Sequence, residues 1–143
     1  VGRYLESRAQ SQDMAAVREF VRSMNDSNVD LLFGIFTKEG GNHIGNIRLG
    51  VIERAAGRAA VGLLIGEPAS WNKGYASEAI RGVSDYAFQT QGLERLYAGC
   101  HADNEGSRRA FLKAGWREEG RQYGHFKRES GRTDMILVGL LKK

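Results

Sequence analysis

Cysteine, proline and long apolar runs are nearly absent from this 143-residue sequence. Cys100 is the single cysteine, which excludes an internal disulfide and fits a reducing compartment, so we expect a cytoplasmic protein. Pro68 is the single proline. No apolar run approaches the roughly 20 residues that a membrane-spanning helix needs. We therefore expect neither a disulfide framework nor a membrane partner.

A strong excess of one charge is also lacking. The chain has 21 basic and 17 acidic residues, a net charge of +4, and the basic residues are scattered. A nucleic-acid-binding protein more often concentrates them in a stripe with interleaved aromatics, so we expect no direct contact with nucleic acid. The mild positive balance favours a cofactor with several phosphates. The length predicts one compact domain over residues 1–143.

The first half of the sequence predicts one helix and three strands. Apolar residues recur at helical spacing from Ser11 to Met24, with Ser11 as a plausible N-cap. Apolar segments at 31–37, 44–51 and 59–65 are separated by turns that contain glycine, which predicts an antiparallel meander. The segment 59–65 is almost wholly apolar, as expected for a central strand covered on both faces.

The second half predicts two helices between further strands. A helix with an apolar face begins after Gly74 and ends before Gly92, and a strand follows at 96–100. Asp103 or Asn104 caps a shorter helix that Gly115 stops. The charged stretch 117–132 and an apolar strand at 135–141 complete one or two more strands. This order predicts a mixed α/β fold of layered helices and strands.

The segment 72–76 carries the clearest chemical signal, because it opens a helix directly after a strand and a loop. The first amides of a helix have no partner within it, and the helix dipole adds partial positive charge there. Gly74 leaves room for a phosphate, Ala76 is small, and Lys73 adds a positive charge. This pattern predicts an anion site. By itself it also fits a plain turn before a helix.

Two motifs then resemble the GNAT superfamily of acetyltransferases. The run from Trp71 to Ala79 is similar to the superfamily's pyrophosphate loop. Asn104–Ser107 and Phe111–Gly120 resemble a segment of the branch that contains the ribosomal-protein N-terminal acetyltransferases. The resemblance extends from about Arg3 to the end. Family members normally carry a first strand and the start of a helix before this point, so we expect the natural chain to begin upstream.

The resemblance implies a fold, an activity and a cofactor. The fold is a mixed, mostly antiparallel sheet flanked by helices, in which two central strands splay to form an acetyl-CoA cleft. The activity is direct transfer of the acetyl group from acetyl-CoA to a primary amine of a protein N-terminus, an amino sugar or another small molecule. No metal is implied. By analogy a homodimer is expected, and residues 138–141 could help to form it.

The resemblance also assigns residues to the cofactor, and two of them depart from the superfamily's pattern. The assigned residues are Leu64, Ile65, Gly66, Trp71, Asn72, Lys73, Gly74, Tyr75, Ala76, Asn104, Ser107, Phe111 and Lys113. Trp71 stands where Gln or Arg is common. Phe111 stands where many members have a Tyr that protonates the departing thiolate, so that acid is absent here. Phe111 is then either a wall against the cofactor or part of the core.

The catalytic groups remain alternatives. Ser107 is the hydroxyl nearest to the missing Tyr position, and it either protonates the thiolate or makes a local bond. Asn104 binds the pantetheine arm or caps its helix, and Lys113 meets phosphates or only solvent. Glu67 and His101 are candidate general bases, and His has the better-matched pKa near neutrality. Glu53, Glu119 and a chain of water molecules are further candidates for the base.

Competing functions follow from the same residues. A covalent acyl-enzyme on Cys100 is disfavoured because His101 points to the opposite face of a regular strand, so Cys100 is expected in the core. A non-catalytic acyl-CoA-binding or sensing domain is a second hypothesis, motivated by the missing Tyr. A nucleotide-binding module is a poorer third, since no Gly-Lys-Ser/Thr sequence follows the glycine.

Overall fold

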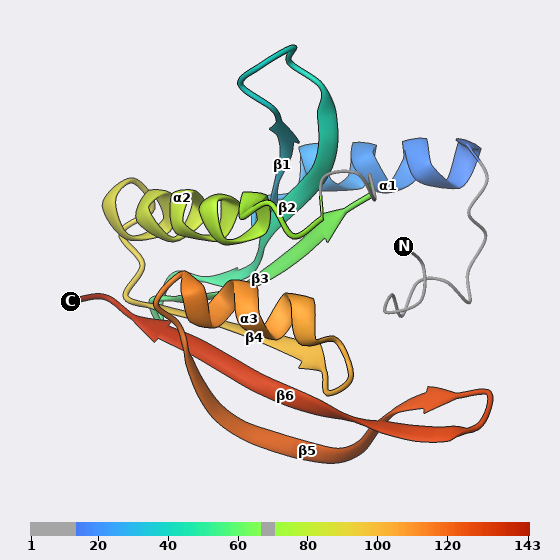
Figure 1. The fold of residues 1–143 in the computed structure, drawn as a ribbon. Helices are drawn as coiled ribbons and strands as arrows, with labels where there is room; N and C mark the ends of the chain where they lie inside the picture. The colour runs from blue at the N-terminus through green and yellow to red at the C-terminus, as the bar shows by residue number, and fades with distance from the viewer. Residues whose placement is uncertain (1–13, 67–70) are drawn as a thin grey trace.

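A six-stranded sheet organises residues 14–66 and 71–143, the part of the chain that the computed structural model describes (Figure 1). Neighbouring strands follow the order β1-β2-β3-β4-β6-β5, and all pairs are antiparallel except the parallel pair of β3 and β4. This confirms the expected mixed, mostly antiparallel sheet. In chain order the elements are α1 (Met14–Asp26), β1 (Leu31–Phe36), β2 (His43–Glu53), β3 (Arg58–Ile65), α2 (Tyr75–Gln89), β4 (Arg95–His101), α3 (Glu105–Lys113), β5 (Arg117–Arg128) and β6 (Gly131–Leu141).

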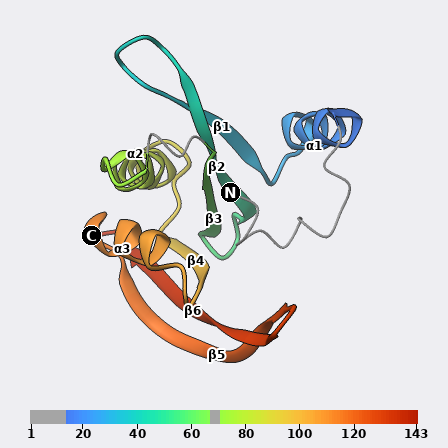
Figure 2. The same ribbon diagram turned by 45° about the vertical axis from the view of Figure 1, so that its right-hand side comes forward.

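The core lies between one face of the sheet and the helices α2 and α3, which cover the same side (Figures 1 and 2). Ile80 and Ala87 of α2 are fully buried against this face. Leu49, Leu96 and Val138 supply matching fully buried side chains from three different strands. The helical periodicity of α2 thus meets the alternation of the strands, and each element buries one side.

The charged stretch 117–132 is regular structure, since it forms β5 and the start of β6. These two strands make a long twisted hairpin at the edge of the sheet (Figure 1). Phe126 is the buried residue of β5. An edge strand has one free side and tolerates charged side chains, which explains why hydrophobic patterning gave little sign of this strand.

The expectation that residues 59–65 are covered on both faces was wrong. Ala59 and Val61 are buried on one face of the strand. On the other face Ala60 is only half-buried and Gly62 is exposed. Of the three described helices, α2 and α3 lie on one face and α1 packs beside β1. The apolar appearance of the strand comes partly from Ala60 and Gly62, which are small enough to lie on a face that no described helix covers.

Helix α1 presents most of its apolar stripe outward. Met14, Val17, Phe20 and Val21 are between 39% and 65% exposed, and no residue of α1 is buried. The helical spacing predicted the element correctly but not its contacts. The proposed N-cap, Ser11, lies outside the described residues.

Asp30 ties the end of the α1–β1 connection to an irregularity in β2. Its carboxylate accepts hydrogen bonds from Arg48, from the amide of Val51 at 3.1 Å and from the hydroxyl of Ser27 at 3.0 Å. Val51 has a φ of 50°, which is unfavourable for a β-branched residue. Burial raises the pKa of Asp30, but these hydrogen bonds outweigh it and the pKa is lowered overall.

Candidate cofactor and transfer site

Strands β3 and β4 lie side by side only at their beginnings. Three consecutive residue pairs join them, Arg58–Arg95, Ala59–Leu96 and Ala60–Tyr97. Beyond these pairs β3 stays with β2, and β4 stays with β6. The backbone edges of residues 61–65 and 98–101 therefore border an opening in the sheet. This confirms the splayed central strands that the family resemblance implied.

The backbone at the end of β3 turns specific groups toward this opening. The amide of Gly66 donates to the carbonyl oxygen of Ile44 at 2.9 Å, so residue 66 faces β2. Because successive residues of a strand turn their backbone groups to alternate edges, the N–H and C=O of Ile65 face the opening. The indole Nε1 of Trp71 donates to the Ile65 carbonyl at 2.9 Å. Of the predicted backbone group Leu64, Ile65 and Gly66, Ile65 is thus the residue directed at the cleft.

The start of α2 has the geometry of an anion site. Gly74 is the N-cap with a φ of 82°, and the preceding Asn72 also has a positive φ, of 61°. Within the described residues, no side chain or carbonyl accepts a hydrogen bond from the amides of residues 75–77. A Cβ added to Gly74 would meet no atom within 4 Å. Glycine is therefore required here by its backbone conformation, and the space beside it is open.

Side chains around this helix start are well placed for a polyanion. Lys73 and Trp71 are exposed, and Tyr75 and Ala76 are half-buried. Glu78 is the acidic residue of the first turn, and its charge opposes an anion there.

Asn104 and Ser107 lie at the β4 side of the opening, where α3 begins. The Asn104 side-chain oxygen accepts a hydrogen bond from the Ser107 amide at 3.2 Å, so Asn104 is the N-cap of α3. Asp103, the alternative cap, instead pairs with Arg128 at 2.8 Å. The pantetheine role of Asn104 and the acid role of Ser107 stay predictions.

Phe111 and Lys113 are less directly placed. Phe111 is 3% exposed and packs in the core with its ring centroid 4.7 Å from that of Trp116. Lys113 is the exposed last residue of α3, about 13 Å along the helix from Asn104 at 1.5 Å per residue. The core role of Phe111 is therefore observed, and contacts of either residue with a cofactor stay predictions.

His101 is the last residue of β4, not part of a loop, and it is 9% exposed. Its ring stacks on that of Phe126, with centroids 3.7 Å apart and planes 11° from parallel. Nη2 of Arg128 lies 3.1 Å from His101 Nδ1 and 2.8 Å from an Asp103 carboxylate oxygen. Phe126 and Arg128 were missed from the sequence, because both lie within the charged run of β5.

Cys100 lies in the core, as expected from the alternation of the strand. It is 3% exposed and belongs to the buried cluster between the sheet and the helices. Burial raises the pKa of its thiol, although a hydrogen bond with Ser107 acts in the opposite direction. A buried thiol that keeps its proton near neutrality is a poor nucleophile.

The candidate carboxylate bases are mostly held by arginines. Glu119 is paired with Arg95, whose hydrogen bond lowers the pKa of that carboxyl despite partial burial. Glu53 is 3.0 Å from Arg58. Glu67 lies outside the described residues. Among residues 14–66 and 71–143, no three His, Cys, Asp or Glu side chains gather as a metal site would need, and no helix is long and apolar enough to cross a membrane.

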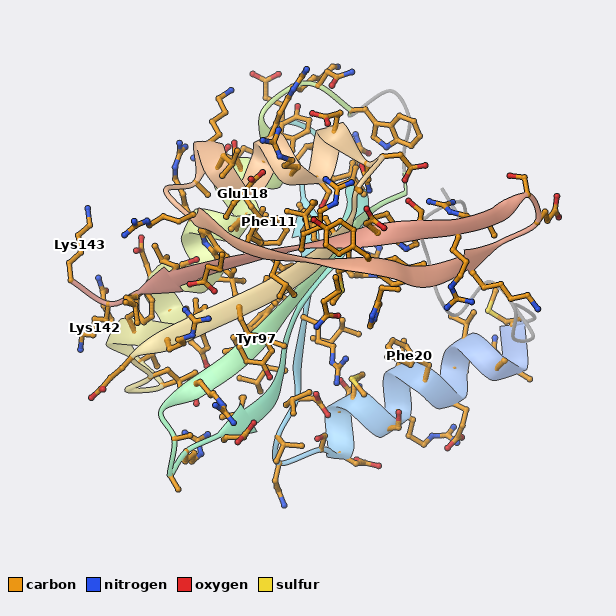
Figure 3. All side chains as sticks on the ribbon, turned by 90° about the horizontal axis from the view of Figure 1, so that it is seen from below. Phe20, Tyr97, Phe111, Glu118, Lys142 and Lys143 are labelled. Atoms are coloured by element: carbon orange, nitrogen blue, oxygen red, sulfur yellow. The ribbon has the colours of Figure 1, made fainter. Side chains whose placement is uncertain are left out.

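Two hollows flank these elements. The first, which we call the open-face groove, measures about 510 Å³ and is lined by residues of β3, β4, β5 and β6, including Arg58, Tyr97, Gly99, Glu119 and Leu137. It lies on the face away from α2 and α3; in Figure 3, which shows the molecule from below, Tyr97 is labelled on the side of the sheet opposite α3. The second measures about 1060 Å³ and runs between the β1–β2 hairpin and α2.

Solved structures that this chain resembles in fold include acetyltransferases. A spermidine N-acetyltransferase from Vibrio cholerae, in complex with CoA and spermine, matches with a TM-score of 0.82 and 21% identity over 92% of this chain and 76% of that one. A GNAT-family acetyltransferase from Bacillus anthracis matches with a TM-score of 0.83 and 24% identity over 99% and 81%. These likenesses define the GNAT acetyltransferase fold.

The sequence matches agree. The uncharacterised N-acetyltransferase p20 of Bacillus licheniformis is 28% identical over 134 residues, which cover 92% of this chain and 75% of that protein. The probable N-acetyltransferase YjcK of Bacillus subtilis is 42% identical over 89 residues, and the match spans about half of its length (49%). The model of the acetyltransferase (GNAT) domain family matches residues 1–117. The chain belongs to this family.

Proposed function

We propose that this protein is an acetyl-CoA-dependent N-acetyltransferase that moves the acetyl group directly to a primary amine. The observation that carries the proposal is the position of the α2 N-terminus next to the opening between β3 and β4. Unaccepted amides at a helix start bind phosphate oxygens, and unpaired strand edges bind an extended amide-containing chain. A pyrophosphate joined to pantetheine has both of these parts in this order.

The residues present fit such a co-substrate. The amides of residues 75–77 and Lys73 would hold the pyrophosphate, and the open space at Gly74 lets it approach the backbone. The Ile65 amide would donate to the thioester carbonyl and stabilise the charge that develops on its oxygen. In the transfer, the amine nitrogen forms a bond to the carbonyl carbon, the C–S bond breaks, and the nitrogen loses a proton. Ser107, at the start of α3, would be the hydroxyl that donates to the departing sulfur.

The acceptor approaches from the open-face groove in this proposal, because α2 and α3 cover the opposite face. The Vibrio cholerae relatives are named for spermidine, which would suggest a polyamine. In this chain, however, the carboxylate that lines the groove, Glu119, is neutralised by Arg95. Among the described residues that line it, the groove therefore offers no unpaired acid to a polycation. We favour a protein N-terminus, in line with the branch that the second motif resembles, or an amine with a single charge.

Two measurements test the proposal. The first follows thiol release from acetyl-CoA with a panel of amines, which should require both substrates. The second measures CoA affinity of Gly74→Ala by calorimetry, with Gly92→Ala as a matched control. Gly92 also has a positive φ, of 69°, and open space at its Cβ, but it follows the other end of α2. Both variants should lose similar stability, of about 1 kcal/mol, and Gly74→Ala alone should bind CoA weakly. Equal affinities would contradict the site.

A non-catalytic acyl-CoA-binding domain is the alternative, favoured by one observation. Phe111 has no hydroxyl and is buried, so it cannot protonate a thiolate. Tight CoA binding without thiol release across the amine panel would support this alternative. A comparison of the thermal shifts caused by ATP, NAD and acetyl-CoA tests the nucleotide-binding module. The acetyltransferase and the acyl-CoA-binding domain should be stabilised by acetyl-CoA most strongly. A homodimer and a cytoplasmic location stay predictions.

A further inference from the structure

The contact between Arg128 and His101 joins two strands that are not neighbours in the sheet. His101 ends β4, while Arg128 ends β5, and β6 lies between these strands. The twist of the β5–β6 hairpin carries Phe126 and Arg128 back over the end of β4. Phe126 covers the imidazole plane, and Arg128 reaches its edge at Nδ1 with Nη2.

The chemistry of this contact fixes the proton of the ring. A guanidinium has only donors, so a hydrogen bond between Arg128 and Nδ1 requires Nδ1 to be the acceptor. A neutral imidazole with an acceptor at Nδ1 carries its proton on Nε2. Protonation of Nδ1 would break the hydrogen bond and place a second cation beside the guanidinium.

Arg128 itself is held in place. Its Nη2 also donates to Asp103 at 2.8 Å, and its side chain is 19% exposed. His101 is 9% exposed, and Phe126 is 8% exposed. The Asp103 carboxylate anchors the Arg128 side chain, and Phe126 packs on one face of the His101 ring. Both side chains therefore have little freedom to move apart.

We propose that Arg128 is a positioning residue that holds His101 as the neutral Nε2–H tautomer, so that the imidazole serves as a hydrogen-bond donor and not as the general base. His101 lies at the end of the strand edge that borders the opening. Its part in acetyl transfer rests on the proposed function, whereas the tautomer does not. The proton from the amine then leaves by another group or by water.

Nuclear magnetic resonance of nitrogen-15-labelled histidine tests the tautomer directly. The chain has three histidines, and loss of one signal set in His101→Gln assigns His101. We expect Nδ1 to be unprotonated and Nε2 to be protonated at neutral pH in the parent protein. Arg128→Gln should change this pattern, and Arg128→Lys should restore it in part. A proton on Nδ1 in the parent, or no change in Arg128→Gln, would overturn the proposal.

Arg121→Gln is the matched control for this experiment. Arg121 lies on the same hairpin, and its guanidinium pairs with Asp134 at 2.7 Å. The control should leave the His101 signals as in the parent. The signals of His43 and His125 report whether each variant is folded.

The pH dependence of kcat/KM tests the donor role. A glutamine can donate from its Nε2 but cannot accept a proton near neutrality. His101→Gln should therefore keep the decline of kcat/KM on the acid side, with His101→Ala slower at every pH. Loss of that decline in His101→Gln would show that His101 is the base and refute the donor role. If no amine supports turnover, the proposed function fails. The nuclear magnetic resonance experiment still determines the tautomer of His101 in that case.

Discussion

Arg95 and Glu119 form a bidentate ion pair that crosses over β6. Nη1 and Nη2 of Arg95, on β4, donate to the two carboxylate oxygens of Glu119, on β5, at 2.7 and 2.5 Å. The strand between them presents Gly139 at this point, and a Cβ there would lie 2.3 Å from a Glu119 oxygen. The missing side chain of Gly139 therefore lets the pair close, and the pair joins both neighbours of β6.

Gly139→Ala should break this bridge. The added methyl group displaces the Glu119 carboxylate, and we expect the free energy of unfolding to fall by about 1 kcal/mol, since both charged groups are about one third exposed. Urea denaturation measures the loss. In a Glu119→Gln background the same substitution should cost less. Equal costs in both backgrounds would show that the methyl group acts on something else.

Asp30→Asn should reduce stability at neutral pH more than at acid pH. The pKa of Asp30 is lowered in the folded protein, so its stabilising contribution is present above the ordinary carboxyl pKa of about 3.9 and is lost as the pH falls below it. We expect a difference of about 2 kcal/mol between parent and variant at neutral pH, as for hydrogen bonds to a charged group. Urea denaturation across this range should show the two proteins converge at low pH. A constant difference would contradict the argument.

Cys100→Ala should leave the initial rate of acetyl transfer essentially unchanged. The thiol is buried and its pKa is raised, so no step should depend on it. We expect a loss of about 1 kcal/mol in stability from the smaller side chain. A thiol reagent should label the folded parent slowly and the unfolded chain rapidly. An inactive but folded variant would return the covalent mechanism to consideration.

Trp71→Phe should weaken acetyl-CoA binding. The phenyl ring keeps an aromatic group but removes the donor to the Ile65 carbonyl, which then lacks that partner beside the cleft. We expect affinity to fall by up to about tenfold, the equivalent of one hydrogen bond. Calorimetry measures this effect. Trp116→Phe is the control, because its indole donates to Ser84 in the core at 3.3 Å and should affect stability instead.

The order of elements and the backbone conformation at the start of α2 could be predicted because local signals carry them. Gly74 needs a positive φ, α2 has a regular apolar stripe, and Asn104 caps its helix with a side chain of the preferred type. Each of these features depends on a few neighbouring residues. The sequence therefore indicated them without knowledge of the rest of the chain.

The surroundings of the candidate catalytic groups could not be predicted in the same way. The contact of Arg128 with His101 joins residues 27 positions apart through the twist of a hairpin. The pairing of Glu119 with Arg95 depends on a glycine in a third strand. The resemblance assigned Trp71 to the cofactor without a contact for its indole, and the structure shows the indole donating to the Ile65 carbonyl. Register and twist decide these contacts, and neither has a local signature.

The short seam between β3 and β4 has a mechanical consequence. Only three residue pairs connect β3 and β4 there, and beyond them β3 continues beside β2 while β4 continues beside β6. A small rotation of β4, β5 and β6 relative to β3 about this seam produces a larger displacement at Ile65 and His101, because these strand ends lie farther from the seam. Under the proposed function, the Arg95–Glu119 pair that joins β4 to β5 therefore helps to set the width available to a thioester.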